Sequence, residues 1–221
     1  LGRVAIGDPT TKGVRMGALA SKSQVEEVRG RVSELAKTAE MVYGSLDSVE
    51  LLGADAEKGA FLSPIVLLEN DPFKNTGVHE IEAFGPVSTI MPYKGIDQAV
   101  ELAQMGKGSL VSSITTFDDN IARDYVLEAA THHGRILVLN RENGKENTGH
   151  GSPLPSLTHG GPGRAGGGEE MGGMRGVKHY MQRCAVQGTP TTLTAVSGIY
   201  QPNAKVIETD KHPFRYHFED I

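Results

Sequence analysis

The residue types most suggestive of chemistry stand in the short run "EAFGP", which begins at Glu82. Glu82 precedes Phe84 by two positions, and Gly85-Pro86 follows at what reads as the start of a strand. A carboxylate can accept hydrogen bonds from two vicinal hydroxyls, as on a ribose, and an aromatic ring can pack against a flat heterocycle. Sites of α/β proteins tend to lie at strand ends. The run therefore fits a nucleotide-binding loop, and it fits equally a solvated carboxylate before a strand.

Two other patterns are weaker candidates for a ligand site. The sequence has eight histidines, and none stands at metal-ligand spacing from a cysteine or from another histidine, so we expect surface or loop histidines and no metal site. Half of residues 159–176 are glycine. The run "GGPGRAGGG" matches neither the phosphate-loop pattern nor the dinucleotide fingerprint, which opens a helix directly after a strand. This stretch either wraps over a site or acts as a linker.

Cys184 is the single cysteine of the sequence and could in principle be a nucleophile. The neighbouring Arg183 would lower the pKa of its thiol if the two side chains met. No Ser, His or Asp partner can be assigned from sequence spacing, and we therefore interpret Cys184 as an incidental thiol.

The elements that must position these residues follow from hydrophobic periodicity. Ser21 with Gln24, or Ser23 with Glu26, fits a capping box, and apolar residues then recur at helical spacing, which predicts a helix over residues 21–37. Strands are predicted over 61–68, where Pro64 favours an edge strand or a break, and over 87–92. Further along, the pattern predicts a helix at 96–103, a strand at 109–117, a helix at 118–130 capped by Asp118 or Asp119, and a strand at 134–140. Strand, helix and strand in succession indicate a parallel crossover, so the class is α/β.

Composition excludes several classes of partner. The chain of 221 residues carries a formal net charge of -5 and has no long basic run, which argues against nucleic acid. Its apolar runs are far shorter than the roughly 18 residues that span a bilayer. One cysteine excludes a disulfide framework and suits a reducing compartment, so we expect a cytoplasmic protein without a membrane anchor. The abrupt first and last segments lead us to expect that both ends are cuts.

The run from Glu82 to Val87 resembles the "E-x-F-G-P-V" signature of the NAD(P)-dependent aldehyde dehydrogenases. Other segments resemble that family in the same order: "VAIGDPTTKGVRMGALASKSQVEEV", "GADAEKGAFLSPIVLLENDP", "SLVSSITTFDDNIARDYVLEAATHHGRILVLN" and "HGGPGRAGGGEEMGGMRGVKHYMQR". The resemblance covers Gly7 to Arg183. It implies the C-terminal portion of a three-layer α/β catalytic domain.

The segments "HGSPLPSLTHGGPGRAGGGEE", "KHYMQR" and "AVQG" resemble the PaaZ-type bifunctional enzymes of phenylacetate degradation. In these enzymes an aldehyde dehydrogenase domain precedes a MaoC-like hot-dog hydratase domain. The resemblance implies a CoA-thioester semialdehyde as substrate, of the 3-oxo-5,6-dehydrosuberyl-CoA semialdehyde type, and NADP or NAD as cofactor. It also implies an oxepin-CoA hydrolase activity in the same protein and a homo-oligomer.

The resemblance implies roles for individual residues. Glu82 would bind the hydroxyls of the nicotinamide ribose, and Phe84 would pack near the nicotinamide. Asn140 and the loop after it would lie close to the substrate entrance. Arg164 belongs to a group of basic residues that could contact the phosphates of CoA or could simply be solvated, namely Arg141, Lys145, Arg164, Arg175 and Lys178.

The family's catalytic residues are not found in this sequence. By the resemblance, the nucleophilic cysteine, the general-base glutamate and the Gly-containing cofactor turn stand upstream of the segment that matches here. We therefore assign no catalytic residue to this chain and expect the chain by itself not to oxidise aldehydes.

We expect residues 1–190 to belong to the aldehyde dehydrogenase catalytic domain. Residues 191–221 would be an oligomerisation strand and a linker toward a MaoC-like domain, with "TPTTLTAVSG" as the strand. Two alternatives stay open: a non-catalytic module that keeps oligomerisation or binding only, and a dehydrogenase for another aldehyde.

Overall fold

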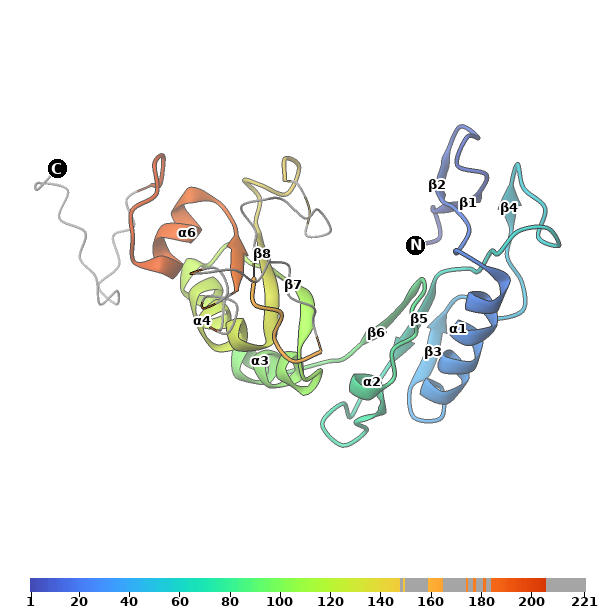
Figure 1. Cartoon of the computed structure of the whole chain (residues 1–221), viewed down its shortest axis with the longest axis horizontal. Helices are drawn as coiled ribbons and strands as arrows, with labels where there is room; N and C mark the ends of the chain where they lie inside the picture. The colour runs from blue at the N-terminus through green and yellow to red at the C-terminus, as the bar shows by residue number, and fades with distance from the viewer. Residues whose placement is uncertain are drawn as a thin grey trace, which may run out of the picture. The chain divides into compact units, whose positions relative to one another are not determined.

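The computed structural model describes residues 1–147, 149, 159–164, 174, 177, 181 and 184–205. The chain divides into two compact units, the first from Leu1 to Tyr93 and the second beginning at Lys94 (Figure 1). Each unit combines helices with a sheet that contains parallel strands. The predicted α/β class is therefore confirmed.

Helix α1 (Lys22–Leu35) is the longest helix described in the first unit. Of the two possible N-caps, the structure selects Ser21, whose Oγ accepts a hydrogen bond of 3.1 Å from the Gln24 backbone N–H. Its apolar stripe is buried and consists of Val25, Val28, Val32 and Leu35. The stripe packs against buried residues of the following segments, including Leu62, Ile65 and Leu67. The helix predicted from periodicity is confirmed, since one apolar face drives its packing.

A small parallel sheet also belongs to the first unit. Strand β1 (Ala5–Gly7) lies between β2 (Val14–Met16) and β4 (Leu51–Leu52). These strands have two or three residues each, too short to leave a periodic signal, and the sequence did not predict them.

The second sheet of this unit positions the Glu82 loop. Strand β5 (Ile65–Leu68) pairs antiparallel with β3 (Glu40–Tyr43) and parallel with β6 (Val87–Ile90). Helix α2 (Gly77–Glu80) precedes the loop that leads into β6. Strand β5 begins directly after Pro64, so the expected break is present, whereas the edge position is wrong because β5 is central.

The second unit contains a parallel sheet in the order β7–β8–β9, with helices packed on it (Figure 1). Its elements are α3 (Gly95–Met105), β7 (Ser109–Thr115), α4 (Asp119–Ala129), the 3-10 turn η1 (Ala130–His132), β8 (His133–Leu139), β9 (Ala185–Gln187) and α6 (Pro190–Ser197). The predicted parallel crossover from β7 through α4 to β8 is confirmed.

The core of the second unit lies where α3 and α4 meet the sheet. Its buried members are Val100, Ala122, Tyr125, Val126, Ala129, Ile136 and Val138. Helix α4 is capped by Asp118, whose carboxylate accepts hydrogen bonds from the N–H groups of Asn120 and Ile121 at 2.8 Å and 3.3 Å. The sequence left Asp118 and Asp119 open as caps, and the structure selects the first. In the described part of the chain, no helix is long and apolar enough to cross a membrane.

The strand predicted for residues 189–198 is wrong, because this segment contains helix α6. Thr189 is the N-cap and accepts from the Thr192 N–H at 3.3 Å, and Pro190 occupies the first turn. Gly198 ends the helix with a φ of 71°. A capping threonine, an early proline and a left-handed glycine are helix boundary signals, and they outweigh the β-propensity of the threonines between them.

Candidate functional site

Glu82 and Phe84 lie in the loop between α2 and β6, where the backbone turns twice in succession. The Gly85 N–H donates to the Ala83 carbonyl at 2.7 Å, and the Val87 N–H donates to the Gly85 carbonyl at 2.8 Å. The turn that the sequence predicted before the strand is therefore present.

This loop is attached to the sheet on one side and to α1 on the other. The Pro86 carbonyl accepts a hydrogen bond of 2.9 Å from the Ile65 N–H at the start of β5. Gly85 packs so closely on α1 that a Cβ at this position would lie 2.8 Å from a methyl group of Val28. The backbone under Glu82 and Phe84 is thus held by both neighbours, and glycine is the residue that permits the contact.

An open hollow of about 420 Å³ borders this loop and is lined by Gln24, Glu82, Ala83, Phe84 and Gly85. Glu82 is exposed, and Phe84 is 73% exposed. An exposed aromatic ring beside a carboxylate can contact a flat ligand that also carries hydroxyl groups. The arrangement offers a hydrogen-bond-accepting carboxylate and a flat apolar face to the same ligand.

Asn140 follows β8 directly and has its amide oxygen engaged by the local backbone. That oxygen accepts from the N–H groups of Glu142 and Asn143 at 2.9 Å and 3.3 Å, and the Asn140 N–H donates to the Asn143 side chain at 2.8 Å. The residue shapes a turn at the carboxyl end of the parallel sheet, where ligand crevices of α/β proteins lie. A hollow of about 180 Å³ there is lined by Phe117, Asp119, Asn140, Glu142, Thr189, Thr191 and Lys205.

Arg164 is the last residue of the described run 159–164 within the glycine-rich stretch. Its N–H donates to the Lys107 carbonyl at 3.2 Å, and its side chain is exposed. Gly163 has a φ of 55°, and a Cβ there would lie 2.0 Å from the same Lys107 carbonyl. Gly163 and Arg164 therefore pack on the chain just before β7, and this contact does not decide between a stretch that wraps over a site and a linker.

The structure does not bring Asn140 and Arg164 together. Lys107, which Arg164 contacts, precedes the first residue of β7, whereas Asn140 follows the last residue of β8. The two strands run parallel, and β8 has 7 residues. At about 3.3 Å per residue, roughly 20 Å of sheet separates the two positions.

The basic residues grouped in the sequence have different surroundings in the structure. The Arg141 guanidinium lies 4.0 Å from the centroid of the Phe117 ring, a cation–π contact within the unit. Lys145 is exposed. Arg175 and Lys178 lie outside the described residues. A shared phosphate site for all of these residues therefore stays a prediction.

Cys184 is partly buried beside the core of the second unit. Burial raises the pKa of its thiol to about 11, because a thiolate loses hydration there. The thiol is protonated at neutral pH, the opposite of what a nucleophilic cysteine requires.

Two histidines depart from the expected surface or loop positions: His79 is buried in α2 and His133 is buried in β8. His159 lies in a loop, as expected, and is also buried. The His79 ring meets the Pro72 carbonyl at 2.9 Å, and the His133 ring meets the Ala129 carbonyl at 2.9 Å. Burial lowers the pKa of His133. Within the described residues, no group of three His, Cys, Asp or Glu side chains is placed to hold a metal ion.

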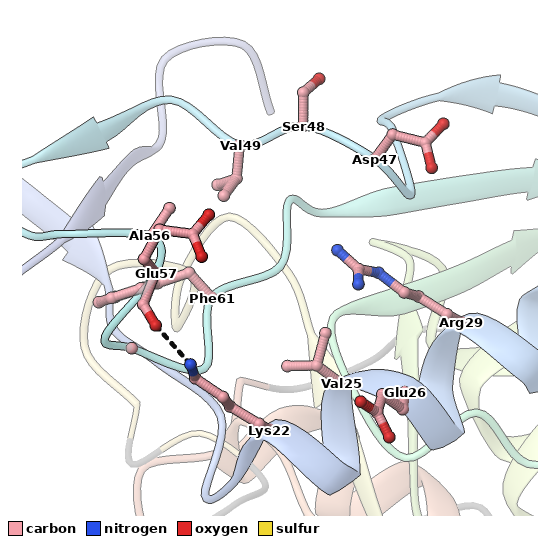
Figure 2. A pocket seen from close by; sticks show the side chains of 11 residues that line it. Lys22, Val25, Glu26, Arg29, Asp47, Ser48, Val49, Ala56, Glu57 and Phe61 are labelled. Carbon is pink, nitrogen blue, oxygen red and sulfur yellow. Dashed lines mark hydrogen bonds between the residues drawn. The ribbon is translucent and has the colours of Figure 1, made fainter.

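Helix α1 borders a second hollow of about 410 Å³, which the sequence did not reveal (Figure 2). Val25 and Arg29 project from α1 toward it, and the Lys22 ammonium donates to the Glu57 carbonyl. Its charged lining residues have both signs: Lys22, Arg29, Glu26, Asp47 and Glu57. Mixed charge of this kind specifies no ligand class.

Gln24 is the residue near Glu82 that sequence reasoning did not connect with the site. Its side-chain Nε2 donates to the Phe84 carbonyl at 2.8 Å, across 60 positions of sequence. The sequence showed Gln24 as a helix-capping residue, and no local signal indicates a contact over such a separation.

The fold agrees with comparisons to known proteins. The family model described as "Aldehyde dehydrogenase family" matches residues 1–186. The chain therefore belongs to the aldehyde dehydrogenase family.

Two relatives indicate the part of the family that this chain is similar to. Protein MaoC from Klebsiella aerogenes is 48% identical over 209 residues, which cover 93% of this chain and 60% of that protein. The 3,4-dehydroadipyl-CoA semialdehyde dehydrogenase from Aromatoleum evansii is 37% identical over 157 residues, covering 71% of this chain and 30% of that enzyme. The chain thus spans less than two thirds of the length of these relatives.

Solved structures of aldehyde dehydrogenases share the fold. A mutant of aldehyde dehydrogenase C from Pseudomonas syringae, in complex with NAD+ and octanal, is 25% identical with a TM-score of 0.61, and the match covers 81% of this chain and 33% of that one. Succinic semialdehyde dehydrogenase from Streptococcus pyogenes, in complex with NADP+, has a TM-score of 0.52 at 20% identity, covering 62% of this chain and 28% of that one. The first relative holds NAD+ and the second NADP+.

Proposed function

We propose that the protein that carries this chain is an NAD(P)-dependent aldehyde dehydrogenase, and that Glu82 and Phe84 bind the nicotinamide end of its coenzyme. One observation carries the proposal: an exposed carboxylate and a 73% exposed aromatic ring border the same hollow on a loop bonded to the sheet. Family membership supports the reaction class.

The two side chains fit that end of the coenzyme by their chemistry. A bound NAD or NADP supplies the acceptor for the hydride that leaves the aldehyde carbon. The Glu82 carboxylate accepts hydrogen bonds from the two ribose hydroxyls, and the Phe84 ring packs on the nicotinamide side. Both groups contact parts that NAD and NADP share, so they leave the choice between the two coenzymes open.

For the substrate we propose a CoA-thioester semialdehyde of the 3-oxo-5,6-dehydrosuberyl-CoA semialdehyde type, which arises in phenylacetate degradation. The similarity to a CoA-semialdehyde dehydrogenase and to Protein MaoC supports this choice. Asn140 would lie at the substrate entrance, and the exposed Arg164 would contact a CoA phosphate. An oxepin-CoA hydrolase activity in the same protein and assembly into a homo-oligomer complete the proposal.

The alternative of a non-catalytic oligomerisation module has lost its main support. That alternative depended on an exposed strand at residues 189–198, and helix α6 occupies this segment. A dehydrogenase for another aldehyde is the remaining alternative, and an assay that compares a CoA-thioester semialdehyde with simple aldehydes distinguishes it from the proposed function.

The test assays the full-length protein that carries this chain with a CoA-thioester semialdehyde and with simple aldehydes, using NAD and NADP in turn. We expect formation of reduced coenzyme with a preference for the thioester substrate. Arg164→Glu should raise KM for the thioester about tenfold, since a charge-assisted contact is lost, and leave KM for a small aldehyde unchanged. Absence of coenzyme reduction would refute the proposed activity. Equal effects of Arg164→Glu on both substrates would refute the phosphate contact.

A further inference from the structure

We infer that Gln24 is a positioning residue that fixes the Glu82–Phe84 loop for coenzyme binding; this inference rests on the proposed function. The Gln24 Nε2 group donates a 2.8 Å hydrogen bond to the Phe84 carbonyl, the backbone atom next to the exposed ring. Gln24 itself would not need to touch the coenzyme. It would act through the loop.

The amide of Gln24 is held at both of its polar atoms. Its Oε1 accepts from the Ala20 N–H at 3.0 Å, while Nε2 faces the Phe84 carbonyl. Rotating the amide by half a turn would place an oxygen against the Phe84 oxygen and an NH₂ group against the Ala20 N–H. The capping bond therefore fixes the direction in which the Nε2 donor points.

The Gln24 backbone is also fixed. Its N–H donates to the Ser21 hydroxyl at 3.1 Å at the start of α1. The donor for the loop thus stands on the first turn of a helix whose apolar stripe is buried in the unit. A rigid element positions a binding group more accurately than a loop can.

Two contacts with α1 flank the Phe84–Gly85 peptide. The Phe84 carbonyl receives the Gln24 bond, and the next residue, Gly85, lies against Val28. With the backbone held at these points, the Phe84 ring and the Glu82 carboxylate remain outside, in the hollow. Such preorganisation favours ligand binding because the loop loses less freedom when the coenzyme arrives.

Two substitutions separate the donor of Gln24 from its acceptor. Gln24→Glu keeps an oxygen for the Ala20 N–H and removes the donor to Phe84. Gln24→Lys keeps a donor and removes the acceptor. The matched control is Gln98→Glu, because Gln98 Oε1 makes the same kind of capping bond, 2.7 Å from the Lys94 N, at helix α3 of the other unit.

The full-length protein is assayed for KM of the coenzyme, KM of the aldehyde and Tm. Gln24→Glu should raise the coenzyme KM about tenfold and keep the aldehyde KM within about twofold. Gln24→Lys should keep the coenzyme KM within about threefold of the wild type, and Gln98→Glu should leave it unchanged. If Gln24 had only a structural role, its two variants and Gln98→Glu would lower Tm, but Gln24→Glu would not have a higher coenzyme KM than the other two variants.

The outcomes separate this inference from the proposed function. Coenzyme turnover by the wild type together with an unchanged coenzyme KM in Gln24→Glu overturns the inference alone. The inference is also overturned if the coenzyme KM rises equally in Gln24→Glu and Gln98→Glu, or equally in Gln24→Glu and Gln24→Lys. Absence of coenzyme-dependent turnover in the wild type overturns the proposed function, and the inference falls with it.

Discussion

Glu82 and Phe84 are exposed side chains on a backbone that has little freedom. Two backbone hydrogen bonds of 2.7 Å and 2.8 Å close the turn from Ala83 to Val87, and the Pro86 carbonyl accepts a hydrogen bond from the first residue of β5. Exposure of the side chains and restraint of the backbone together distinguish this loop from an ordinary surface turn. A ligand that meets it has two chemically different contacts at fixed positions.

Replacing Glu82 tests the role of the carboxylate. Glu82→Gln should raise the coenzyme KM of the full-length enzyme about tenfold, since an amide retains one acceptor oxygen and loses the charge that strengthens both hydrogen bonds. Steady-state kinetics with varied coenzyme measures the effect. Glu80→Gln is the matched control, because Glu80 is also exposed and stands two residues earlier. A similar KM change in both variants would mean that local charge, not the ribose contact, is responsible.

At the scale of elements, α1 connects the unit's core with the loop. One side of this helix buries Val25, Val28, Val32 and Leu35, and its first turn provides Gln24. Val28 belongs to both environments, since it is 1% exposed and also lies against Gly85. The packing of the helix and the position of the loop are therefore coupled through one side chain.

Substitutions at Gly85 and Val28 should therefore not be additive. Gly85→Ala should destabilise the chain by about 1–3 kcal/mol, because its Cβ would meet a Val28 methyl at 2.8 Å. Val28→Ala should cost about 2 kcal/mol through the cavity it leaves. In the double variant, alanine at position 28 leaves room for the new methyl group at position 85. The destabilisation of the double variant should therefore be at least about 1 kcal/mol smaller than the sum of the two single-variant values. Urea unfolding measures all three.

Gly30→Ala is the control for the Gly85 experiment. Gly30 lies within the same helix and has nothing within 4 Å of a built Cβ. Alanine there should stabilise the chain by about 1 kcal/mol, as helix propensity predicts. Additive behaviour of Gly85→Ala and Val28→Ala would contradict the close contact between loop and helix.

In the whole molecule, the groups proposed to bind the coenzyme stand on a chain without a reactive thiol. The sequence contains one cysteine, Cys184, and burial raises its pKa to about 11. Covalent aldehyde oxidation requires a thiolate nucleophile. The matched residues cover 60% of the length of Protein MaoC and 30% of the length of the 3,4-dehydroadipyl-CoA semialdehyde dehydrogenase.

We accordingly expect the 221-residue chain by itself to reduce no coenzyme above the blank when it is incubated with NAD or NADP and an aldehyde. Absorbance of the reduced nicotinamide measures this, with the full-length protein as the positive reference. Turnover by the chain that Cys184→Ser abolishes would contradict the prediction and make Cys184 a nucleophile.

Strong local signals in the sequence were enough to predict several elements. The α1 stripe, helix α4 and the β7–α4–β8 crossover each depend on residues within about thirty positions, so hydrophobic periodicity was sufficient to predict them. The "EAFGP" run likewise indicated the candidate loop, because its residue types carry the chemistry. In residues 189–198, the signals of a helix were present and were misread as a strand.

Contacts between residues far apart in the sequence could be assigned only from the folded structure. Gln24 reaches Phe84 across 60 positions, whereas Asn140 and Arg164 stand at opposite ends of one sheet. The number of residues between two positions does not show whether they meet in the folded chain. Contacts of this kind depend on how α1 packs on the sheet and on the direction of β7 and β8, which are set by burial of apolar surface over the whole unit and not by any local pattern.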